Sequence, residues 1–422
     1  FCLEKRFLAE DCKNPFGVIQ CKLSRQANIP NTGRGVLHLP EGRNFSMANH
    51  TTRETELQVV TLTNSDGKSM DFYVDPATGA TVEPLRDDKF PQMRKKKCGN
   101  LRLADIYRAA GYAKYADRAR SCATWLLYLG NAAMDKKQLH AMNACRLRLC
   151  PFCNTRKARI MGMRLSKIIQ KVKTDHPGTQ LVFLTLTVQN VAGDGLRDAL
   201  TLLTGSWSKL TRRTPFVVAV KGFFRVLEIT RNRVDDTYHP HIHAILVVED
   251  GYFVRKNGLY ITHDQWVGMW QQSLRVDYRP VVGIQSTYAK GGKGKPSKGA
   301  AAAAAAVAEA AKYATKDAEY IGRSVPDGEA VQVVRTYTEA LRGKRMTALG
   351  GWMKDAAKQL DIDMEDAGDL VHEDGSGDLT EATAELLLTY GWHFGVADHI
   401  LMDVRPNPDY QGGDADDVAG QG

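Results

Sequence analysis

The sequence predicts an α+β fold in which an antiparallel-rich sheet packs against helices. Three observations support this prediction: secondary-structure signals in the order β-α-β-β, a strand that alternates histidine with apolar residues, and a cysteine-rich segment before them. Strands joined first by a helix and then by a hairpin favour a sheet of mainly antiparallel neighbours with helices on one face. The expected core is therefore a sheet domain preceded by a small cysteine-bearing segment.

The β-α-β-β order can be read from the apolar spacing. Leu181–Val188 is an apolar run typical of a buried strand, and Leu196–Leu210 has the spacing of an amphipathic helix. Two strands are expected over residues 222–230 and 240–248, and the polar loop between them favours a hairpin. Another helix is expected around Asp264–Gln272.

The second strand of the hairpin carries His239, His241 and His243, which occupy every second position. On a strand they share one face. Two neutral imidazoles about 7 Å apart can hold one divalent ion if a third ligand approaches from the neighbouring strand. The hairpin would place Glu228 beside them. A His-x-His pair is weak by itself, so a solvated, histidine-rich strand end is the alternative.

Four of the eight cysteines are crowded together, which favours a metal site over a disulfide framework. Cys150 and Cys153 flank a Cys-Pro-x-Cys turn whose thiolates can face one ion, and Cys122 and Cys145 would complete a tetrahedral zinc site. His140 is an alternative to Cys122, and four unrelated reduced thiols are the alternative to a site. A predicted DNA-binding surface surrounds the segment and comprises Arg146, Arg148, Arg156, Lys157 and Arg159.

The charge distribution predicts a protein that binds polyanions. The 422 residues carry a net charge of +9. From Asp361 onward there are 16 acidic residues against Arg405 alone, a charge of −15 that leaves +24 on residues 1–360. A basic body of this size favours a nucleic-acid partner, and a basic face kept for solubility is the alternative.

Composition narrows the class of protein further. Hydrophobic residues make up 43% and charged residues 25% of the chain, as in ordinary globular proteins. The sequence contains no run of 18 or more apolar residues, so no membrane span is predicted, and no signal peptide is expected. Clustered cysteines outside a disulfide framework favour the cytoplasm. Because position 1 is Phe1, either the sequence starts inside a longer protein or translation starts at Met47, Met70 or Met93.

Two further helices are expected. Leu101–Ala119 has apolar residues at helical spacing opposite basic ones, and Ala300–Ala311 is strongly helix-prone. Glu309 and Tyr313 stand four residues apart and would be neighbours on one helix face. By itself this is an ordinary surface pair. The basic loop Gly291–Gly299 lacks the spacing of a Walker phosphate loop, so no ATPase motif is present.

Together these motifs resemble the HUH endonucleases, and in detail the rolling-circle replication initiators of plasmids from Gram-positive bacteria. Phe183–Thr187, His239–His243 preceded by Glu228, and Glu309–Tyr313 follow the order of the three family motifs. The Cys145–Cys153 segment is also similar to a cysteine segment of the family. The likeness covers about residues 94–372.

The resemblance implies a DNA strand transferase. Tyr313 would attack a phosphate and form a 5′-phosphotyrosyl link with a free 3′-OH, and Glu309 would act as general base for a second, terminating cleavage. Mg²⁺ or Mn²⁺ would bind to Glu228, His241 and His243, and the zinc would be structural.

The resemblance also implies partners. Lys312 and Lys316 would contact phosphates of double- and single-stranded origin DNA, and a host helicase and DNA polymerase would complete replication. No membrane partner is expected. Two alternatives differ in function: a rolling-circle transposase, which typically has two tyrosines on one helix turn, and a non-catalytic, zinc-stabilised DNA-binding repressor.

The resulting organisation has five parts. In order they are an unassigned N-terminal region over 1–93, a basic helical and zinc-knuckle segment over 94–175, an HUH nicking and strand-transfer domain over 176–325, a family C-terminal segment over 326–372, and an acidic tail over 373–422.

Overall fold

The computed structural model describes residues 57–63, 69–75, 81–82, 84–87, 90–286, 316–364 and 379–411. The chain divides into two compact units, one drawn from Phe1–Pro84 with His393–Asp398 and the other from Leu85–Trp392 with His399–Gly422. Glu309, Lys312 and Tyr313 lie outside the described residues. So do the basic loop and the alanine-rich helix predicted before them.

The smaller unit contains a three-stranded antiparallel sheet in the order β1-β2-β3. Its strands are β1 (Gln58–Thr63), β2 (Ser69–Val74) and β3 (Thr81–Val82). Within this unit the buried hydroxyl of Tyr73 donates a 2.8 Å hydrogen bond to the carboxylate of Asp398.

The larger unit is built around a five-stranded sheet in the order β10-β7-β8-β6-β9, in which every neighbouring pair is antiparallel. The strands are β6 (Gln180–Thr187), β7 (Val220–Asn232), β8 (Thr237–Val248), β9 (Val282–Ser286) and β10 (Thr347–Gly351). With α4 (Leu196–Leu210) between β6 and β7, this confirms the predicted β-α-β-β order and the α+β class.

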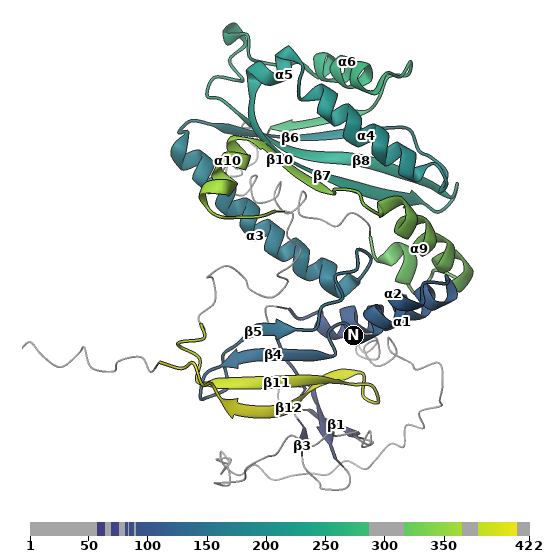
Figure 1. Cartoon of the computed structure of the whole chain (residues 1–422), viewed down its shortest axis with the longest axis vertical. Coiled ribbons are helices and arrows are strands. Elements are labelled where there is room, and N and C mark those ends of the chain that lie inside the picture. The colour runs from purple at the N-terminus through teal and green to yellow at the C-terminus, as the bar shows by residue number, and fades with distance from the viewer. Residues whose placement is uncertain are drawn as a thin grey trace, which may run out of the picture. The chain divides into compact units, whose positions relative to one another are not determined.

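Helices cover both faces of this sheet, although the sequence predicted helices on one face only (Figure 1). On one face, α4, α6 (His263–Leu274) and α9 (Asp327–Leu341) share an apolar core with the alternate residues Ile242, Ala244 and Leu246 of β8. On the other face, α3 (Pro151–Asp175) and α10 (Trp352–Gln359) pack with Ile245 and Val247. The second face is covered because β8 is apolar on both sides beyond its histidines.

A second sheet of the larger unit has the order β12-β11-β4-β5. It is formed by β4 (Trp125–Gly130), β5 (Lys137–Met142), β11 (Leu386–His393) and β12 (Asp398–Pro406). The strands β11 and β12 fall in the segment predicted as an acidic tail. Their acidic flanks dominate the composition there, but Leu387, Leu388 and Tyr390 are buried against β4.

The basic helix predicted over Leu101–Ala119 is two helices, α1 (Met93–Ala109) and α2 (Ala113–Ser121). The break occurs at Gly111, whose φ of +86° lies in the left-handed region that glycine adopts without strain. The chain can therefore turn there. Both halves keep their basic outer faces.

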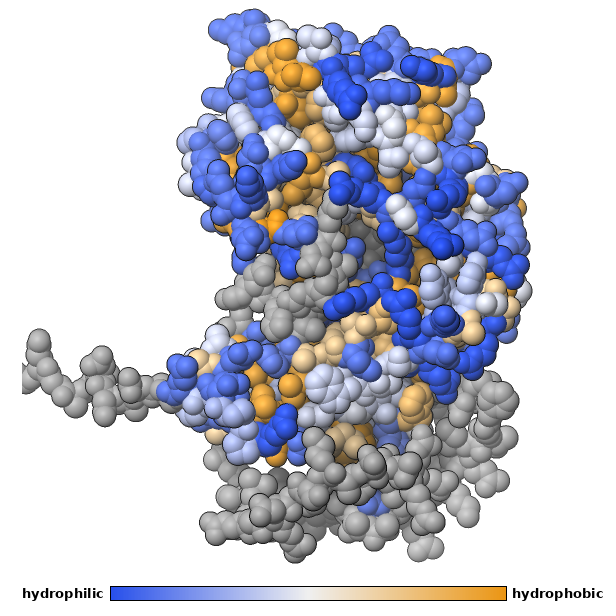
Figure 2. Space-filling model, viewed as in Figure 1, coloured by the Kyte–Doolittle hydropathy of each residue, from blue (hydrophilic) through white to orange (hydrophobic). Residues whose placement is uncertain are grey.

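The remaining short elements are α5 (Thr214–Ala219), the 3₁₀ turn η2 (Arg255–Asn257) and α8 (Ala318–Ile321). In the part of the chain that the structure describes, no helix has the length and apolar character needed to cross a membrane. Hydrophilic side chains cover much of the visible surface over α3 and α9 (Figure 2).

Candidate functional site

The β7–β8 hairpin brings Glu228, His241 and His243 together. Glu228 lies directly opposite His241 in the strand register. Its Oε2 atom is 3.4 Å from His241 Nε2 and 3.0 Å from His243 Nε2, and the three side chains are largely buried. Side chains alternate between the two faces of β8, and the short hairpin sets β7 beside it. Glu228 therefore lies next to His241 and His243, as the sequence predicted.

The second ring nitrogens of the histidines have partners on the other side. His243 Nδ1 is 3.1 Å from the hydroxyl of Thr185 on β6, and His241 Nδ1 is 3.1 Å from the carbonyl oxygen of His239. These contacts orient the rings so that both Nε2 atoms face Glu228. Phe183 stacks on His243 with ring centroids 5.3 Å apart.

Thr185 is a residue whose role the sequence reading missed. It belongs to the motif that supports the family resemblance, and it pairs with His243 across the β6–β8 ladder. The period of two along β6 places it on the histidine face. Only the pairing of β6 with β8, a non-local contact, gives it a partner.

Electrostatics keep Glu228 ionised. Burial opposes the charged carboxylate, but hydrogen bonds and charge from His241 and His243 hold the pKa of Glu228 below its ordinary range. Burial, together with the neighbouring His241, lowers the pKa of His239. At neutral pH the group therefore offers one carboxylate to a cation.

The donor atoms of Glu228, His241 and His243 all lie within 4.8 Å of one another. Two imidazoles and a carboxylate suit a first-row divalent cation and tolerate Mg²⁺. The residues therefore fit a metal ion. Three protein ligands also leave coordination positions for oxygen atoms of a substrate or water.

A second group consists of the buried cysteines Cys122, Cys145, Cys150 and Cys153, whose sulfurs lie within 4.8 Å of one another. Sulfur–sulfur distances of 3.5 to 3.7 Å separate Cys153 from Cys122 and Cys145, and Cys122 from Cys150. Zinc–sulfur bonds of about 2.3 Å in a tetrahedron require sulfur–sulfur edges of about 3.8 Å. The cysteines therefore fit a zinc ion, and His140, which faces Glu381 at 3.6 Å, is not part of the group.

Neighbouring polar groups suit a negatively charged zinc–thiolate site. The amide of Asn100 is fully buried. Its oxygen accepts from the Cys150 thiol at 3.0 Å, while its nitrogen has no hydrogen-bond partner among the residues that the structure describes. If Cys150 is a thiolate, the amide can turn so that its nitrogen donates to the sulfur. The buried ammonium of Lys97 donates to the carbonyl oxygens of Arg120 and Cys122, both at 2.6 Å.

The predicted DNA-contacting residues differ in exposure. Arg146 and Arg148 are exposed beside the cysteine group, and Lys157 and Arg159 are half-buried on α3. Arg156 is only 3% exposed, and its guanidinium lies 6.0 Å from the ring centre of Phe90. It offers little surface to DNA because that ring packs beneath it. Lys316 is exposed, whereas Lys312 lies outside the described residues.

Comparison with known proteins decides the family. The model of a replication-protein family, Rep_1, matches residues 136–399. The chain belongs to this family of rolling-circle Rep initiators. It is 34% identical over 286 residues to Protein rep of Streptococcus pneumoniae serotype 2, a match that covers 68% of this chain and 84% of that protein.

Other Rep proteins match over most of their length. The identity is 33% to Protein rep of Lactiplantibacillus plantarum, over 76% of this chain and 98% of that protein. It is 31% to Protein rep of Bacillus amyloliquefaciens, over 73% of this chain and 92% of that protein. No solved structure matches the chain. The family match extends past residue 372, where the resemblance read from the sequence ended, and takes in β11.

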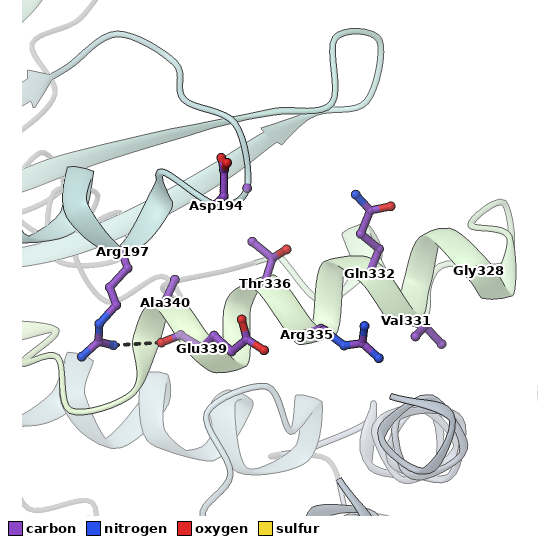
Figure 3. Close-up of a pocket in the computed structure, with 10 residues that line it drawn as sticks. Asp194, Arg197, Gly328, Val331, Gln332, Arg335, Thr336, Glu339 and Ala340 are labelled. Atoms are coloured by element: carbon purple, nitrogen blue, oxygen red, sulfur yellow. Dashed lines mark hydrogen bonds between the residues drawn. The ribbon is translucent and has the colours of Figure 1, made fainter. Parts of the chain in front are cut away.

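A cavity of about 600 Å³ lies elsewhere in this Rep chain, between α9 and the loop that begins α4 (Figure 3). Arg197 and Arg335 line it together with Asp194 and Glu339. Arg197 donates to the carbonyl oxygen of Glu339 at 2.9 Å. None of its lining residues belongs to the histidine or the cysteine group.

Tyr320 is the tyrosine that follows Tyr313 along the sequence. It is fully buried, and its hydroxyl donates a 2.8 Å hydrogen bond to the carbonyl oxygen of Leu149. A nucleophile must reach a DNA phosphate. Tyr320 is therefore held away from that task in this structure.

Proposed function

We propose that the protein initiates plasmid rolling-circle replication by nicking one strand of its double-strand origin and attaching itself to the 5′ end of the cut strand. The observation that carries this proposal is the Glu228–His241–His243 group in a member of the Rep family. An HUH endonuclease domain is the fold that this activity implies. The reaction would take place in the cytoplasm.

In the proposed first step, the phenolic oxygen of Tyr313 attacks the scissile phosphorus. A Tyr–O–P bond forms, the P–O3′ bond breaks, and the 3′ oxygen takes a proton to become the primer hydroxyl. A phenol with a pKa of about 10 is a weak nucleophile at pH 7, so in-line positioning must supply much of the rate. A divalent cation on Glu228, His241 and His243 would supply Lewis-acid polarisation of the phosphate.

The residues around the metal group have defined tasks in this proposal. Thr185 and the carbonyl oxygen of His239 fix the ring orientation of the two histidines. The ionised Glu228 balances cation charge. Imidazole ligands favour Mn²⁺, whereas abundance in the cell favours Mg²⁺. Lys316, which is exposed and follows Tyr313 by three residues, would contact a flanking phosphate.

Termination requires a second cleavage after one round of synthesis. With Tyr313 already esterified to DNA, water is the nucleophile at hand, and Glu309 would act as its general base. The released strand would then carry no protein. A host DNA polymerase would extend the 3′-OH. A host helicase would separate the strands, because this sequence contains no ATPase motif that could drive unwinding.

The cysteine group would hold a structural zinc ion. In this role Cys122 and Cys145 are joined to the first turn of α3, which starts at the Cys150–Cys153 turn. Arg146 and Arg148 flank the group and face solvent. A fixed knuckle would hold these cations in place for origin DNA.

Two other functions fit the observations less well. A rolling-circle transposase with paired tyrosines would need a second accessible tyrosine near Tyr313, and Tyr320 is buried. A repressor without catalysis gives no reason for Glu228, His241 and His243 to converge with both Nε2 atoms facing the carboxylate. The nickase proposal accounts for both observations.

The deciding experiment is a cleavage assay with labelled single-stranded fragments that tile the replicon encoding the chain. With Mn²⁺ or Mg²⁺, the wild-type chain should cut one fragment and remain attached to its 5′ end, which a denaturing gel detects as a shifted band. Tyr313→Phe should bind that fragment and give no adduct. A persistent adduct in the variant, or cleavage without any adduct in the wild type, would refute the tyrosine mechanism.

A further inference from the structure

The segment that follows Tyr313 in the chain is held by two different parts of the larger unit. The described chain resumes at Lys316 and enters the short helix α8 at Ala318. Three residues of extended chain span about 10 Å at most. The place at which α8 is fixed therefore limits where Tyr313 can reach.

The first attachment joins α8 to the strand that carries the metal ligand Glu228. The carboxylate of Glu319 accepts a 3.2 Å hydrogen bond from the backbone N–H of Arg231, which lies three residues after Glu228 on β7. Glu319 also accepts a hydrogen bond from the hydroxyl of Tyr337 on α9.

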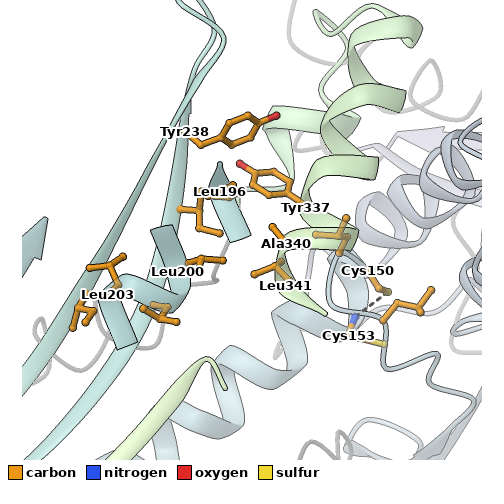
Figure 4. Close-up of a cluster of buried hydrophobic side chains, with 14 of the residues drawn as sticks. Cys150, Cys153, Leu196, Leu200, Leu203, Tyr238, Tyr337, Ala340 and Leu341 are labelled. Atoms are coloured by element: carbon orange, nitrogen blue, oxygen red, sulfur yellow. Dashed lines mark hydrogen bonds between the residues drawn. The ribbon is translucent and has the colours of Figure 1, made fainter. Parts of the chain in front are cut away.

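Tyr337 in turn packs against the β7–β8 hairpin, which carries Glu228, His241 and His243. It is fully buried, and its ring meets that of Tyr238 on β8 edge to face, with centroids 5.4 Å apart (Figure 4). Glu319 is therefore bonded to the β7–β8 hairpin directly through Arg231 and indirectly through Tyr337.

The second attachment joins α8 to the cysteine group. Tyr320 donates to the carbonyl oxygen of Leu149, the residue immediately before Cys150. Asp317 accepts a 2.6 Å hydrogen bond from the ammonium of Lys96 on α1. Both bonds run from the α8 segment to elements that surround the four cysteines.

Close packing on α1 strengthens the second attachment. A side-chain carbon added at Gly99 would lie 2.8 Å from Ile321 of α8 and 3.1 Å from Pro151 of the Cys-Pro-x-Cys turn. Residue 99 is thus the point at which α8 and the cysteine turn both approach α1. Glycine leaves room for the two contacts.

We propose that Glu319 and Tyr320 are positioning residues that hold Tyr313 in line with the phosphate bound at the metal group. The inference rests on the proposed function. Glu319 sets the distance of α8 from β7, and Tyr320 ties it to the cysteine segment. In this role Glu319 and Tyr320 affect the reaction only through the position of Tyr313, and neither residue contacts DNA or the metal. A misplacement of about 1 Å at a reacting group can cost roughly 100-fold in rate.

Ordinary core packing would give the same contacts, and the chain offers a matched control for it. Tyr128 on β4 is also fully buried, and its hydroxyl also donates one hydrogen bond of 2.8 Å, to Asp87. Neither Asp87 nor Met93, whose sulfur lies 3.8 Å from this hydroxyl, belongs to α8. Tyr320→Phe and Tyr128→Phe each remove one buried hydroxyl from the same unit, so a purely structural effect should be alike in both.

The test measures single-turnover adduct formation by the full-length chain on the single-stranded fragment that the wild type cleaves. For Tyr320→Phe we expect the rate at saturating DNA to fall by about 10- to 100-fold, because the tyrosine is no longer held in line. The DNA and Mn²⁺ concentrations that give half-maximal rate should stay within about 2-fold. Tyr128→Phe should leave all three quantities within about 2-fold of the wild type.

A second pair of variants decides the outcome if Tyr320→Phe does not fold. Glu319→Gln keeps the shape but loses one of two acceptor oxygens. Glu385→Gln makes the same change at another half-buried carboxylate that accepts a backbone N–H, from Ala132 in the turn between β4 and β5. Only Glu319→Gln should lower the rate at saturating DNA.

The outcomes separate this inference from the function on which it rests. If the wild-type chain forms no adduct, the proposed function fails and the positioning role fails with it. If the wild type forms the adduct but Tyr320→Phe keeps the wild-type rate, or loses DNA affinity instead, the positioning role is overturned alone. An equal loss of rate in Tyr128→Phe would also overturn it.

Discussion

At the scale of single residues, we expect substitutions in the Glu228–His241–His243 group to abolish cleavage and leave DNA binding nearly unchanged. Replacing both His241 and His243 by Ala removes two of the three proposed metal ligands. The proposed nicking should then fall at least about 100-fold, since a Lewis-acid cation is worth several kcal/mol. The affinity for single-stranded DNA should change little, because the exposed arginines lie elsewhere. Cleavage rates and filter-binding affinities measured on the same preparations check both statements.

His239→Ala is the matched control for that prediction. Its carbonyl oxygen, which accepts from His241, belongs to the backbone and survives the substitution. We therefore expect this variant to keep its Mn²⁺ dependence. If it loses nicking as completely as the double variant does, the ligand set has to be revised to include His239.

Glu309 provides a second residue-scale prediction, about termination. Glu309→Ala should nick and form the tyrosyl adduct normally, but the second cleavage should slow by roughly 10²- to 10⁴-fold without a general base. Single strands longer than one plasmid unit should then accumulate in a replication assay. Normal termination by Glu309→Ala would refute the general-base role and leave Glu309 as an ordinary surface carboxylate.

Single residues also show how far the sequence alone could lead. Glu228 and the two histidines were predictable, because strand alternation and a short hairpin are local rules. The role of Thr185 was not, because it depends on the pairing of β6 with β8. The choice of Cys122 over His140 likewise depends on the approach of α2 to the cysteine turn, which no local spacing encodes.

At the scale of elements, a zinc ion on the four cysteines would tie the start of α3 to Cys122 and Cys145. Cys150 caps α3, and its sulfur accepts a hydrogen bond from the Cys153 N–H at 3.3 Å, so the same sulfur would serve both the helix and the proposed zinc. We expect one zinc per chain by metal analysis of the purified protein. Cys150→Ser should lose the ion and lower the midpoint of thermal unfolding by roughly 5 °C or more.

Chelation offers a reversible form of the same experiment. Removing zinc from the wild type should lower the unfolding midpoint, and adding zinc back should restore it. Zinc-free protein with an unchanged midpoint would show that the four sulfurs are ordinary buried thiols.

Elements also mark where sequence reading failed. The helix pattern over Leu101–Ala119 ran through Gly111 because the apolar spacing continues on both sides, and only the backbone conformation reveals the break. The strands β11 and β12 were not predicted, because the many acidic residues around them gave the segment the composition of an acidic tail. A short strand with one buried face carries little periodic signal, and its partner β4 is far away in the sequence.

At the scale of the whole molecule, pH should change the stability of the larger unit through His399. Burial lowers the pKa of His399 to about 4, and the charge of Lys97 acts in the same direction. Its ring nitrogen Nε2 is 2.7 Å from the carbonyl oxygen of Ala123. The neutral ring is therefore part of the native contact between β12 and the chain after α2.

The unfolded chain binds a proton at a pKa of about 6.5, so between the two values it holds more protons than the folded chain. The contribution of His399 is fully present above pH 6.5 and is lost as the pH falls toward 4. Between pH 7 and pH 5 the free energy of unfolding should drop by about 2 kcal/mol from this group. His399→Gln, which can still donate to Ala123, should lack that component in urea titrations at the two pH values.

The pairing of β11 with β4 also bears on how the protein is made. Leu386 pairs with Gly130, so β4 leaves the ribosome roughly 250 residues before its neighbour, a delay of about 10 to 50 seconds at ordinary translation rates. During that interval the apolar edge of β4 has no strand to cover it and is open to pairing with other nascent chains. The sheet beside the cysteine segment therefore stays incomplete until β11 has been synthesised, long after the cysteines themselves have left the ribosome.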